Sequence, residues 1–174
     1  MIAMIAFAAL AVLPSPLVTP GGVAGIDATT TLKQLEDMFA DETIEHTREH
    51  LGEGYYSEGS SVWRGTDMEI AVVWNENGTP MEIRLIGEAW RTADGIGLGS
   101  TLTELEAVIG EFEIAGFAWD NEGYADLWET PYEGIFIRLL PRGPAEDFIG
   151  DSFFPSSSMR SLNPVVVDFR VFFF

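Results

Sequence analysis

The sequence predicts an α+β protein in which two tandem repeats, each a helix followed by antiparallel strands, share one sheet with helices on one face. Three observations predict this class: a duplicated segment, helix-start residues in both copies, and period-two alternation after each copy. The duplication relates Gly25–Glu36 to Gly95–Glu106, which are identical at six of twelve positions. Self-similarity at a fixed offset is typical of duplicated supersecondary units. We therefore expect one compact domain made of repeat unit one, residues 25–94, and repeat unit two, residues 95–174, after a signal peptide and linker at residues 1–24.

Each repeat begins with residues that favour the start of a helix. Thr31 is followed three positions later by Gln34, and Thr101 by Glu104. This spacing is that of the capping box, in which the threonine oxygen accepts a backbone N–H and the longer side chain reaches back. Gly110 is placed to end the second helix. Apolar residues follow each start at helical spacing: Leu32, Leu35 and Phe39 in the first copy, and Leu102, Leu105, Val108 and Ile109 in the second.

Most of the remaining chain alternates with a period of two, which is typical of antiparallel strands with one covered face. The alternating segments are residues 68–75, 81–86, 135–140 and 165–174. Asn75–Gly78 and Asp120–Gly123 have the composition of hairpin turns. Residues 141–161 contain prolines and consecutive serines, so we expect a long irregular loop there.

The charge balance limits the possible partners. The chain has 28 acidic and 9 basic residues, which gives a formal net charge of −19. Such a surface repels phosphate backbones, so we expect no nucleic-acid binding. A solvated acidic coat, favoured where salt screens charges, accounts for this composition. Binding of a cationic partner or of divalent cations is the alternative.

The first part of the chain predicts export. Residues 1–13 form an unbroken apolar run that is too short to span a bilayer and matches the apolar region of a secretory signal peptide. The chain contains no cysteine, so neither disulfides nor a lipid-modified cysteine can hold it. We expect a periplasmic or secreted protein with no stable membrane span and no cofactor.

Residues 46–50, with the sequence His-Thr-Arg-Glu-His, match the H-x-x-E-H zinc motif of inverted-motif metalloproteases. That chemistry requires two imidazoles one helical turn apart and a glutamate that activates zinc-bound water. Period two fits the segment equally well, and on a strand His46, Arg48 and His50 share one face while Glu45 and Glu49 share the other. A small metal-dependent hydrolase that uses His46, Glu49 and His50 is therefore the alternative to a protein without a catalytic site.

Aromatic residues gather in the predicted strands and turns. Tyrosine and tryptophan are enriched at binding hot spots because they bury much area at little entropy cost. Packing between helix and sheet is the alternative for each ring, and exposure of Trp74 and Trp119, which border predicted turns, would favour binding. The candidate binding residues are Tyr55, Tyr56, Trp63, Trp74, Trp119 and Asp120.

The paired segments Gly25–Glu36 and Gly95–Glu106, each followed by strands, resemble the beta-lactamase-inhibitor-protein-like architecture. A single unit is similar to the small outer-membrane assembly lipoproteins of the SmpA/OmlA type, which carry an acylated cysteine that this chain lacks. Trp90–Gly99, Gly116–Asp120 and Met159–Pro164 resemble an uncharacterised family of bacterial exported proteins. These resemblances imply an exported domain but transfer no activity and no contact residue.

Together these observations favour an exported, non-enzymatic binding module. It would use a sheet face with aromatic and acidic residues to bind an envelope or extracellular protein. A structural subunit of an envelope assembly is a further alternative.

Overall fold

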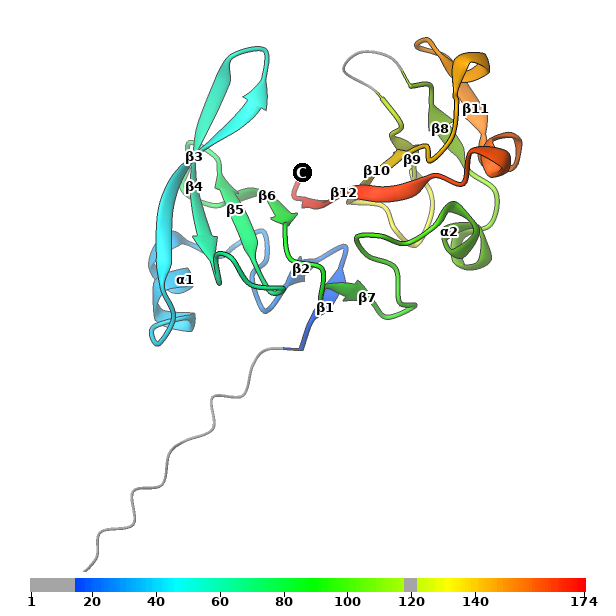
Figure 1. Cartoon of the computed structure of the whole chain (residues 1–174). Coiled ribbons are helices and arrows are strands. Elements are labelled where there is room, and N and C mark those ends of the chain that lie inside the picture. Colours follow the sequence, from blue (N-terminus) through cyan, green and yellow to red (C-terminus); the bar gives the residue numbers. More distant parts are fainter. Residues whose placement is uncertain (1–14, 118–121) are drawn as a thin grey trace, which may run out of the picture.

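The computed structural model describes residues 15–117 and 122–174, which form three β-sheets with short helices beside them (Figure 1). The elements in chain order are β1 (Leu17–Thr19), β2 (Gly22–Val23), α1 (Leu32–Met38), β3 (Ile44–Gly52), β4 (Tyr55–Val62), β5 (Ile70–Trp74), β6 (Pro80–Leu85), β7 (Arg91–Thr92), α2 (Leu102–Ile109), β8 (Glu113–Ala115), β9 (Ala125–Asp126), β10 (Ile135–Leu140), the 3-10 helix η2 (Glu146–Phe148), β11 (Phe153–Pro155), the 3-10 helix η3 (Ser156–Leu162) and β12 (Val165–Phe172).

The predicted α+β class is wrong, because the described residues are mostly β and do not form helix-plus-strand repeats with helices on one face. The two α-helices have only 7 and 8 residues. The strands of the two predicted repeats are also arranged differently. The first repeat supplies β3, β4, β5 and β6 to the largest sheet and β7 to a small one, whereas the second divides its strands between the largest sheet and a third sheet.

The reason is that capping residues specify where a helix begins, not how far it extends. Both predicted capping boxes are present: the Thr31 N–H donates to Gln34 Oε1 at 2.8 Å, and the Thr101 N–H donates to Glu104 Oε2 at 2.7 Å. α2 ends at Gly110, where φ is 87°, as a C-terminal glycine favours. Each helix therefore starts as predicted but stops after about two turns.

The largest sheet has the strand order β10-β12-β6-β5-β4-β3, and every neighbouring pair is antiparallel. The predicted turn Asn75–Gly78 joins β5 to β6, with Gly78 at a φ of 80°. β12 meets β6 through three residue pairs only. This short pairing is the junction between strands of the two predicted repeats.

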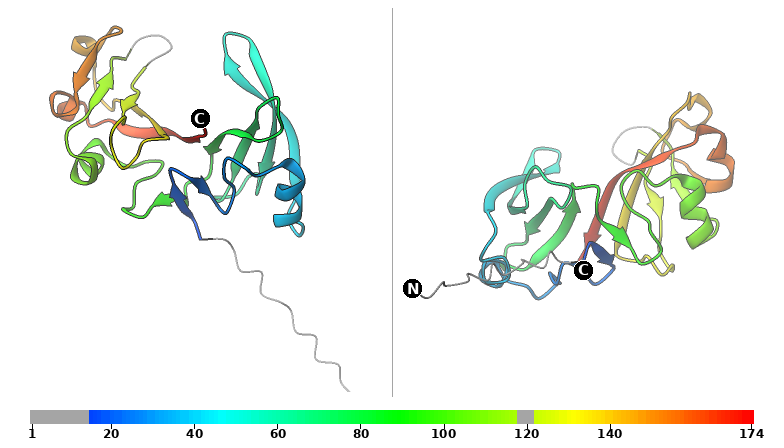
Figure 2. Two further views of the ribbon diagram at one scale, coloured as in Figure 1. Left: turned by 180° about the vertical axis from the view of Figure 1, so that it is seen from behind. Right: turned by 60° about the horizontal axis from the view of Figure 1, so that its bottom comes forward.

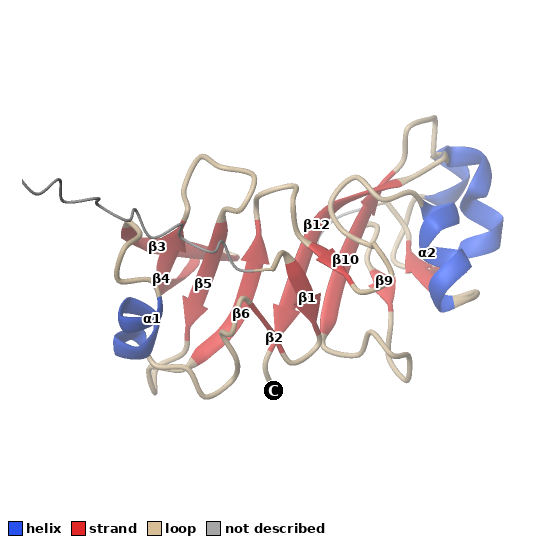
Figure 3. Ribbon diagram, turned by 90° about the horizontal axis from the view of Figure 1, so that it is seen from below, coloured by secondary structure: helices blue, strands red, loops and turns tan. Residues whose placement is uncertain are grey.

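One face of this sheet is covered and the other is open. The small sheet with the order β2-β1-β7 packs on the covered face, and Figure 3 shows β1 and β2 lying across the strands of the large sheet. Val18, Val23 and Ile26 join the core there with Ile83 and Val171. Figure 2 shows that the β3–β4 hairpin and the region of β8 and β11 stand on the two sides of the β6–β12 junction. The sheet thus curves around its uncovered side, which we call the open face.

The third sheet has the strand order β11-β8-β9 and lies next to β10. An isolated bridge between Tyr124 and Arg138 connects the two. β11, η2 and all but the last residue of η3 lie within residues 141–161, so this predicted loop has more regular structure than expected. One edge strand of the large sheet, β10, is therefore partly covered by the third sheet. The other edge strand is β3.

Candidate functional site

In β6 and β12, charged side chains on the open face alternate with apolar side chains that point into the core on the covered face. In β6, Glu82 and Arg84 flank Ile83, and β12 carries Arg170 next to Val171. The register places Arg84 opposite Arg170 and Ile83 opposite Val171. Successive side chains of a strand point to opposite faces, so the apolar pair enters the core and the charged residues line the open face.

Five charged residues of the open face form a row of alternating charge, which we call the charge ladder: Glu49, Arg84, Glu82, Arg170 and Asp168. Arg84 Nη1 lies 3.2 Å from Glu49 Oε2, and Arg84 Nε lies 2.5 Å from Glu82 Oε1. Arg170 Nη1 lies 3.5 Å from Glu82 Oε2. Its Nε and Nη2 donate to the two oxygens of Asp168 at 2.9 and 2.5 Å. The ladder therefore runs from β3 through β6 to β12 and crosses the junction.

Glu82 lies at the centre of the ladder and is only 2% exposed. A buried carboxylate is costly unless it is paired and hydrogen-bonded, and two guanidinium groups provide that pairing here. Burial opposes the charged form of Arg170, but hydrogen bonding to Asp168 and the charges of Asp168 and Glu82 outweigh it and raise the pKa of Arg170. The groups of the ladder are engaged with one another, which suits a fixed recognition surface better than proton transfer.

A groove of about 460 Å³ opens between the β3–β4 hairpin and the opposite side of the open face. The hairpin contributes His50, Leu51, Gly52, Glu53 and Tyr55, and the opposite wall contributes Tyr124 and Arg170. Tyr55 is 69% exposed, so most of its ring is available to a ligand. A concave site that combines aromatic side chains with a few fixed polar groups is typical of binding sites.

Aromatic rings extend the open face beyond the ladder. The ring centroids of Tyr124 and Phe136 lie 4.1 Å apart, and those of Phe136 and Phe172 lie 5.4 Å apart. The guanidinium carbon of Arg170 lies 5.5 Å from the Phe136 centroid. Ring pairs and cation–π contacts of this kind hold side chains in place. We call Tyr124, Phe136 and Phe172 the aromatic row.

Two of the predicted binding residues, Tyr55 and Tyr56, are exposed at the start of β4. Neighbouring residues of a strand point to opposite faces, and only Tyr55 lines the groove. Tyr56 instead packs against Arg48, whose guanidinium carbon lies 5.0 Å from the Tyr56 ring centroid, and against His50, whose ring centroid lies 5.0 Å away. The structure therefore brings Tyr55, but not Tyr56, to the groove.

Trp63 and Trp74 are buried in the core. Trp74 is 5% exposed, and its indole N–H donates to Ser60 Oγ at 3.0 Å. Trp63 is buried against Phe39 and Trp90, and its indole N–H has no hydrogen-bond partner among the described residues. Packing, the alternative that the sequence left open, accounts for both rings.

Three sequence predictions fall outside the described residues. Trp119 and Asp120, both candidate binding residues, belong to residues 118–121. The apolar run at residues 1–13, on which the expectation of export depends, also lies outside them. The predicted hairpin turn Asp120–Gly123 is described only at its end.

The His46, Glu49 and His50 cluster lies on strand β3 rather than on a helix. Residues i and i+4 of a strand are separated by roughly 13 Å along it, which is too far for two imidazoles to share one zinc ion. His46 Nε2 lies 4.0 Å from Glu36 Oε1, while Glu49 bonds to Arg84 on the other face. Within residues 15–117 and 122–174, no three His, Cys, Asp or Glu side chains are placed to hold a metal ion.

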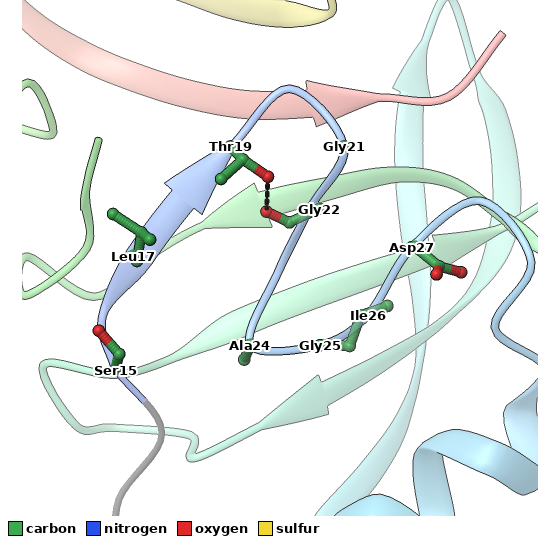
Figure 4. Close-up of a pocket in the computed structure, with 9 residues that line it drawn as sticks. All are labelled: Ser15, Leu17, Thr19, Gly21, Gly22, Ala24, Gly25, Ile26 and Asp27. Carbon is green, nitrogen blue, oxygen red and sulfur yellow. Dashed lines mark hydrogen bonds between the residues drawn. The ribbon is translucent and has the colours of Figure 1, made fainter. Parts of the chain in front are cut away.

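Two other hollows offer less chemistry. The first, of about 390 Å³, lies beside β1 and β2 (Figure 4). Its one acidic lining residue, Asp27, is occupied because its Oδ1 accepts hydrogen bonds from the Thr29 N–H and hydroxyl at 2.8 and 2.7 Å. The second, of about 430 Å³, brings His46 and Trp74 together on the covered side of β4, but neither residue faces the groove.

Sequence reasoning did not single out Glu82, Arg84, Asp168, Arg170 and Tyr124. A signal was present: Glu82 and Arg84, like Asp168 and Arg170, are oppositely charged residues two positions apart in predicted strands. That spacing places each pair on one face of its strand. Which strands are neighbours, and hence that the pairs meet, is not encoded in the spacing.

No protein-family model matches this chain, and no curated protein matches it. Among solved structures, the crystal structure of the uncharacterized protein yfeY from Escherichia coli is similar, with a TM-score of 0.58 and 16% sequence identity. The alignment covers 90% of this chain and 99% of that chain. At this identity the similarity extends to the fold alone. The resemblance to bacterial exported proteins therefore stays a prediction.

Proposed function

We propose that this chain is an exported, non-enzymatic binding module that holds a polypeptide partner in the groove of its open face. The single observation that carries the proposal is that the groove is lined from two separate parts of the chain, the β3–β4 hairpin and the side formed by Tyr124 and Arg170. A polypeptide laid in the groove would contact both walls. The exposed tyrosine at the hairpin, Tyr55, supplies the kind of side chain that dominates binding energy.

The chemistry of the groove favours binding over catalysis. Arg170 bonds to Asp168 and Glu82, and Glu49 bonds to Arg84, so these groups are already engaged. A general base or acid must reach the proton that it transfers, which an engaged carboxylate does poorly. A prearranged surface lowers the entropy cost of association instead. The charge ladder therefore supports recognition.

Export is part of the proposal and depends on the apolar run at residues 1–13. In residues 15–117 and 122–174 there is no helix of the length and apolar character needed to cross a membrane. The partner is accordingly proposed to be an envelope or extracellular protein.

Site-specific photocrosslinking in cells tests the proposal. A benzoylphenylalanine at position 55 should form a discrete adduct with a partner, whereas one at position 108, exposed on α2, should not. Leu51→Ala, which trims the groove wall at an exposed residue, should reduce the adduct, and Ile149→Ala, exposed elsewhere, should leave it unchanged. Fractionation of the same cells should place the chain outside the cytoplasm.

Equal adducts from positions 55 and 108, or no adduct from position 55, would contradict binding in the groove. A chain retained in the cytoplasm would contradict export. The two parts of the proposal are therefore tested separately.

A further inference from the structure

A further hollow, distinct from the two described above, lies where β10 begins and β12 ends, and it is smaller and more apolar than the groove. It has a volume of about 170 Å³, and we call it the slot. Its large apolar lining residues are Leu127, Trp128, Ile135, Phe136, Phe172 and Phe174. Phe136 and Phe172 also belong to the aromatic row, so the slot and the groove are connected along one surface.

The turn after β9 forms one wall of the slot. The Trp128 N–H donates to Asp126 Oδ1 at 3.1 Å, and the Thr130 hydroxyl donates to the Leu127 carbonyl at 2.6 Å. On the other side, the Phe172 N–H donates to the Gly134 carbonyl at 2.8 Å, which fixes the end of β12 beside β10. The walls are thus set by hydrogen bonds within the fold.

Trp128 leaves a large apolar surface in solvent. It is 66% exposed, although neighbouring Leu127 is buried. Exposed tryptophan next to an apolar hollow is typical of an interaction site, because its burial gives a large gain for little lost freedom. An apolar cavity of about 150 Å³ accommodates benzene, so the slot is large enough for one aromatic or branched aliphatic side chain.

The charge around the slot determines which residues of the partner are favoured next to the bound side chain. Asp126 and Glu133 line it, and Glu129 is exposed in the same turn. None of the described residues that line it is a lysine or an arginine. An acidic rim favours a partner that carries ammonium or guanidinium groups beside its anchor, and the Trp128 ring adds a cation–π contact.

We propose that the slot binds one aromatic or aliphatic side chain of a basic polypeptide segment, with the flanking lysines or arginines at the acidic rim. This inference deepens the proposed function and depends on it only in that the ligand is a polypeptide. A second copy of the chain is a poor occupant, because two molecules of net charge −19 repel each other.

Nuclear magnetic resonance of the full-length, nitrogen-labelled protein tests the slot directly. The probe is the peptide acetyl-GKKFKKG-amide, and the matched peptides are acetyl-GEEFEEG-amide and acetyl-GKKGKKG-amide. We expect saturable shifts at the Trp128 indole and the Gly134 amide with the first peptide, and about tenfold weaker binding for the other two.

Variants of the protein separate the contributions of Trp128 and of the acidic rim to peptide binding. Trp128→Ala, at an exposed position, should weaken binding about tenfold, and the pair Asp126→Asn and Glu133→Gln should weaken it about threefold at low salt. The control pair Glu146→Gln and Asp147→Asn removes two exposed charges from η2 and should bind like the unaltered protein.

Shifts that map elsewhere, equal binding of the acidic peptide, or binding unaffected by Trp128→Ala would overturn the inference. So would a concentration-dependent dimer in sedimentation that Trp128→Ala abolishes, since a second copy would then occupy the slot. Peptide binding at the slot without a crosslink from position 55 would leave this inference standing and remove the groove proposal, and the reverse result would do the opposite.

Discussion

At the scale of single residues, Glu82 has the most consequential position on the open face. Arg84 and Arg170 are directly opposite each other in neighbouring strands, an arrangement that is destabilising for like charges. Glu82 bonds to both guanidinium groups, and Glu49 and Asp168 bond to their outer sides. The carboxylate of Glu82 therefore makes the β6–β12 pairing possible at this point.

We predict that Glu82→Ala lowers the free energy of unfolding by about 3 kcal/mol, because it leaves two largely buried guanidinium groups facing each other without their shared partner. Urea unfolding followed by circular dichroism measures the change. Glu82→Gln, which keeps the shape but removes the charge, should fall between Glu82→Ala and the unaltered protein.

The matched control for this prediction is Glu76→Gln at the exposed β5–β6 turn, which should change stability by less than about 0.5 kcal/mol. If Glu82→Ala were as mild as this control, the ladder would contribute nothing to the junction. Replacing all five ladder residues, Glu49, Glu82, Arg84, Asp168 and Arg170, together by apolar residues should restore part of the loss, since no unpaired charge of the ladder would remain.

At the scale of elements, a partly buried carboxylate, that of Glu106, connects α2 to η3. Glu106 Oε1 accepts the Ser156 hydroxyl at 2.6 Å, and Glu106 Oε2 accepts Arg160 Nε at 2.6 Å. Burial raises the pKa of Glu106, but the hydrogen bonds from Arg160 and Ser156 outweigh it, so the pKa is lowered from its ordinary value of 4.5. The ionised form is thus the one that holds the two elements together.

This direction predicts an acid-sensitive contribution to stability. A carboxyl group with a lowered pKa in the folded state stabilises the protein above its unfolded pKa, and the contribution is lost as pH falls through the folded value. Glu106→Gln should therefore destabilise the protein at pH 7, and its difference from the unaltered protein should shrink progressively below pH 4.5. Urea unfolding over a series of pH values measures this difference. Glu88→Gln, at an exposed position, is the control, and a Glu106→Gln effect independent of pH would show that packing alone is responsible.

The same scale shows what the sequence could predict. Both helix starts were correct because the capping boxes Thr31–Gln34 and Thr101–Glu104 are local, and β5, β6, β10 and β12 were correct because the alternation of their residues is local too. The β3–β4 hairpin was not predicted as such, because β3 has polar residues on both faces and so lacks apolar alternation. The class was wrong because two local helix signals were given the weight of a repeating architecture.

The candidate site was harder to predict than the elements. Tyr55 was identified from composition, but Arg170 and Tyr124 come from distant parts of the chain and reach the groove only through strand order. Trp63 and Trp74 were misleading because a large ring next to a turn serves the core as well as a surface. Contacts between strands far apart in sequence are what sequence patterns of period two do not contain.

At the scale of the whole molecule, attraction within the ladder is opposed by repulsion over the surface. The ladder has three carboxylates and two guanidinium groups at short distances. The complete chain carries a net charge of −19, and a charge this far from zero destabilises a compact state. Exposed charges that act over long distances are screened by salt, whereas short and largely buried pairs are screened much less.

We predict that added salt stabilises the protein. Raising the ionic strength from 10 mM to 150 mM shortens the Debye length from about 30 Å to about 8 Å, which removes most of the repulsion between distant carboxylates but little of the attraction within the ladder. A gain of about one to two kcal/mol corresponds to a rise in Tm of about 2 to 8 °C for a chain of this size. Thermal denaturation in sodium chloride measures the shift, and choline chloride at the same ionic strength should give the same result because screening depends on charge alone. A fall in Tm would show that exposed ion pairs outweigh the net charge. A larger rise with millimolar calcium than with sodium chloride of equal ionic strength would instead identify specific binding of divalent cations by the acidic surface.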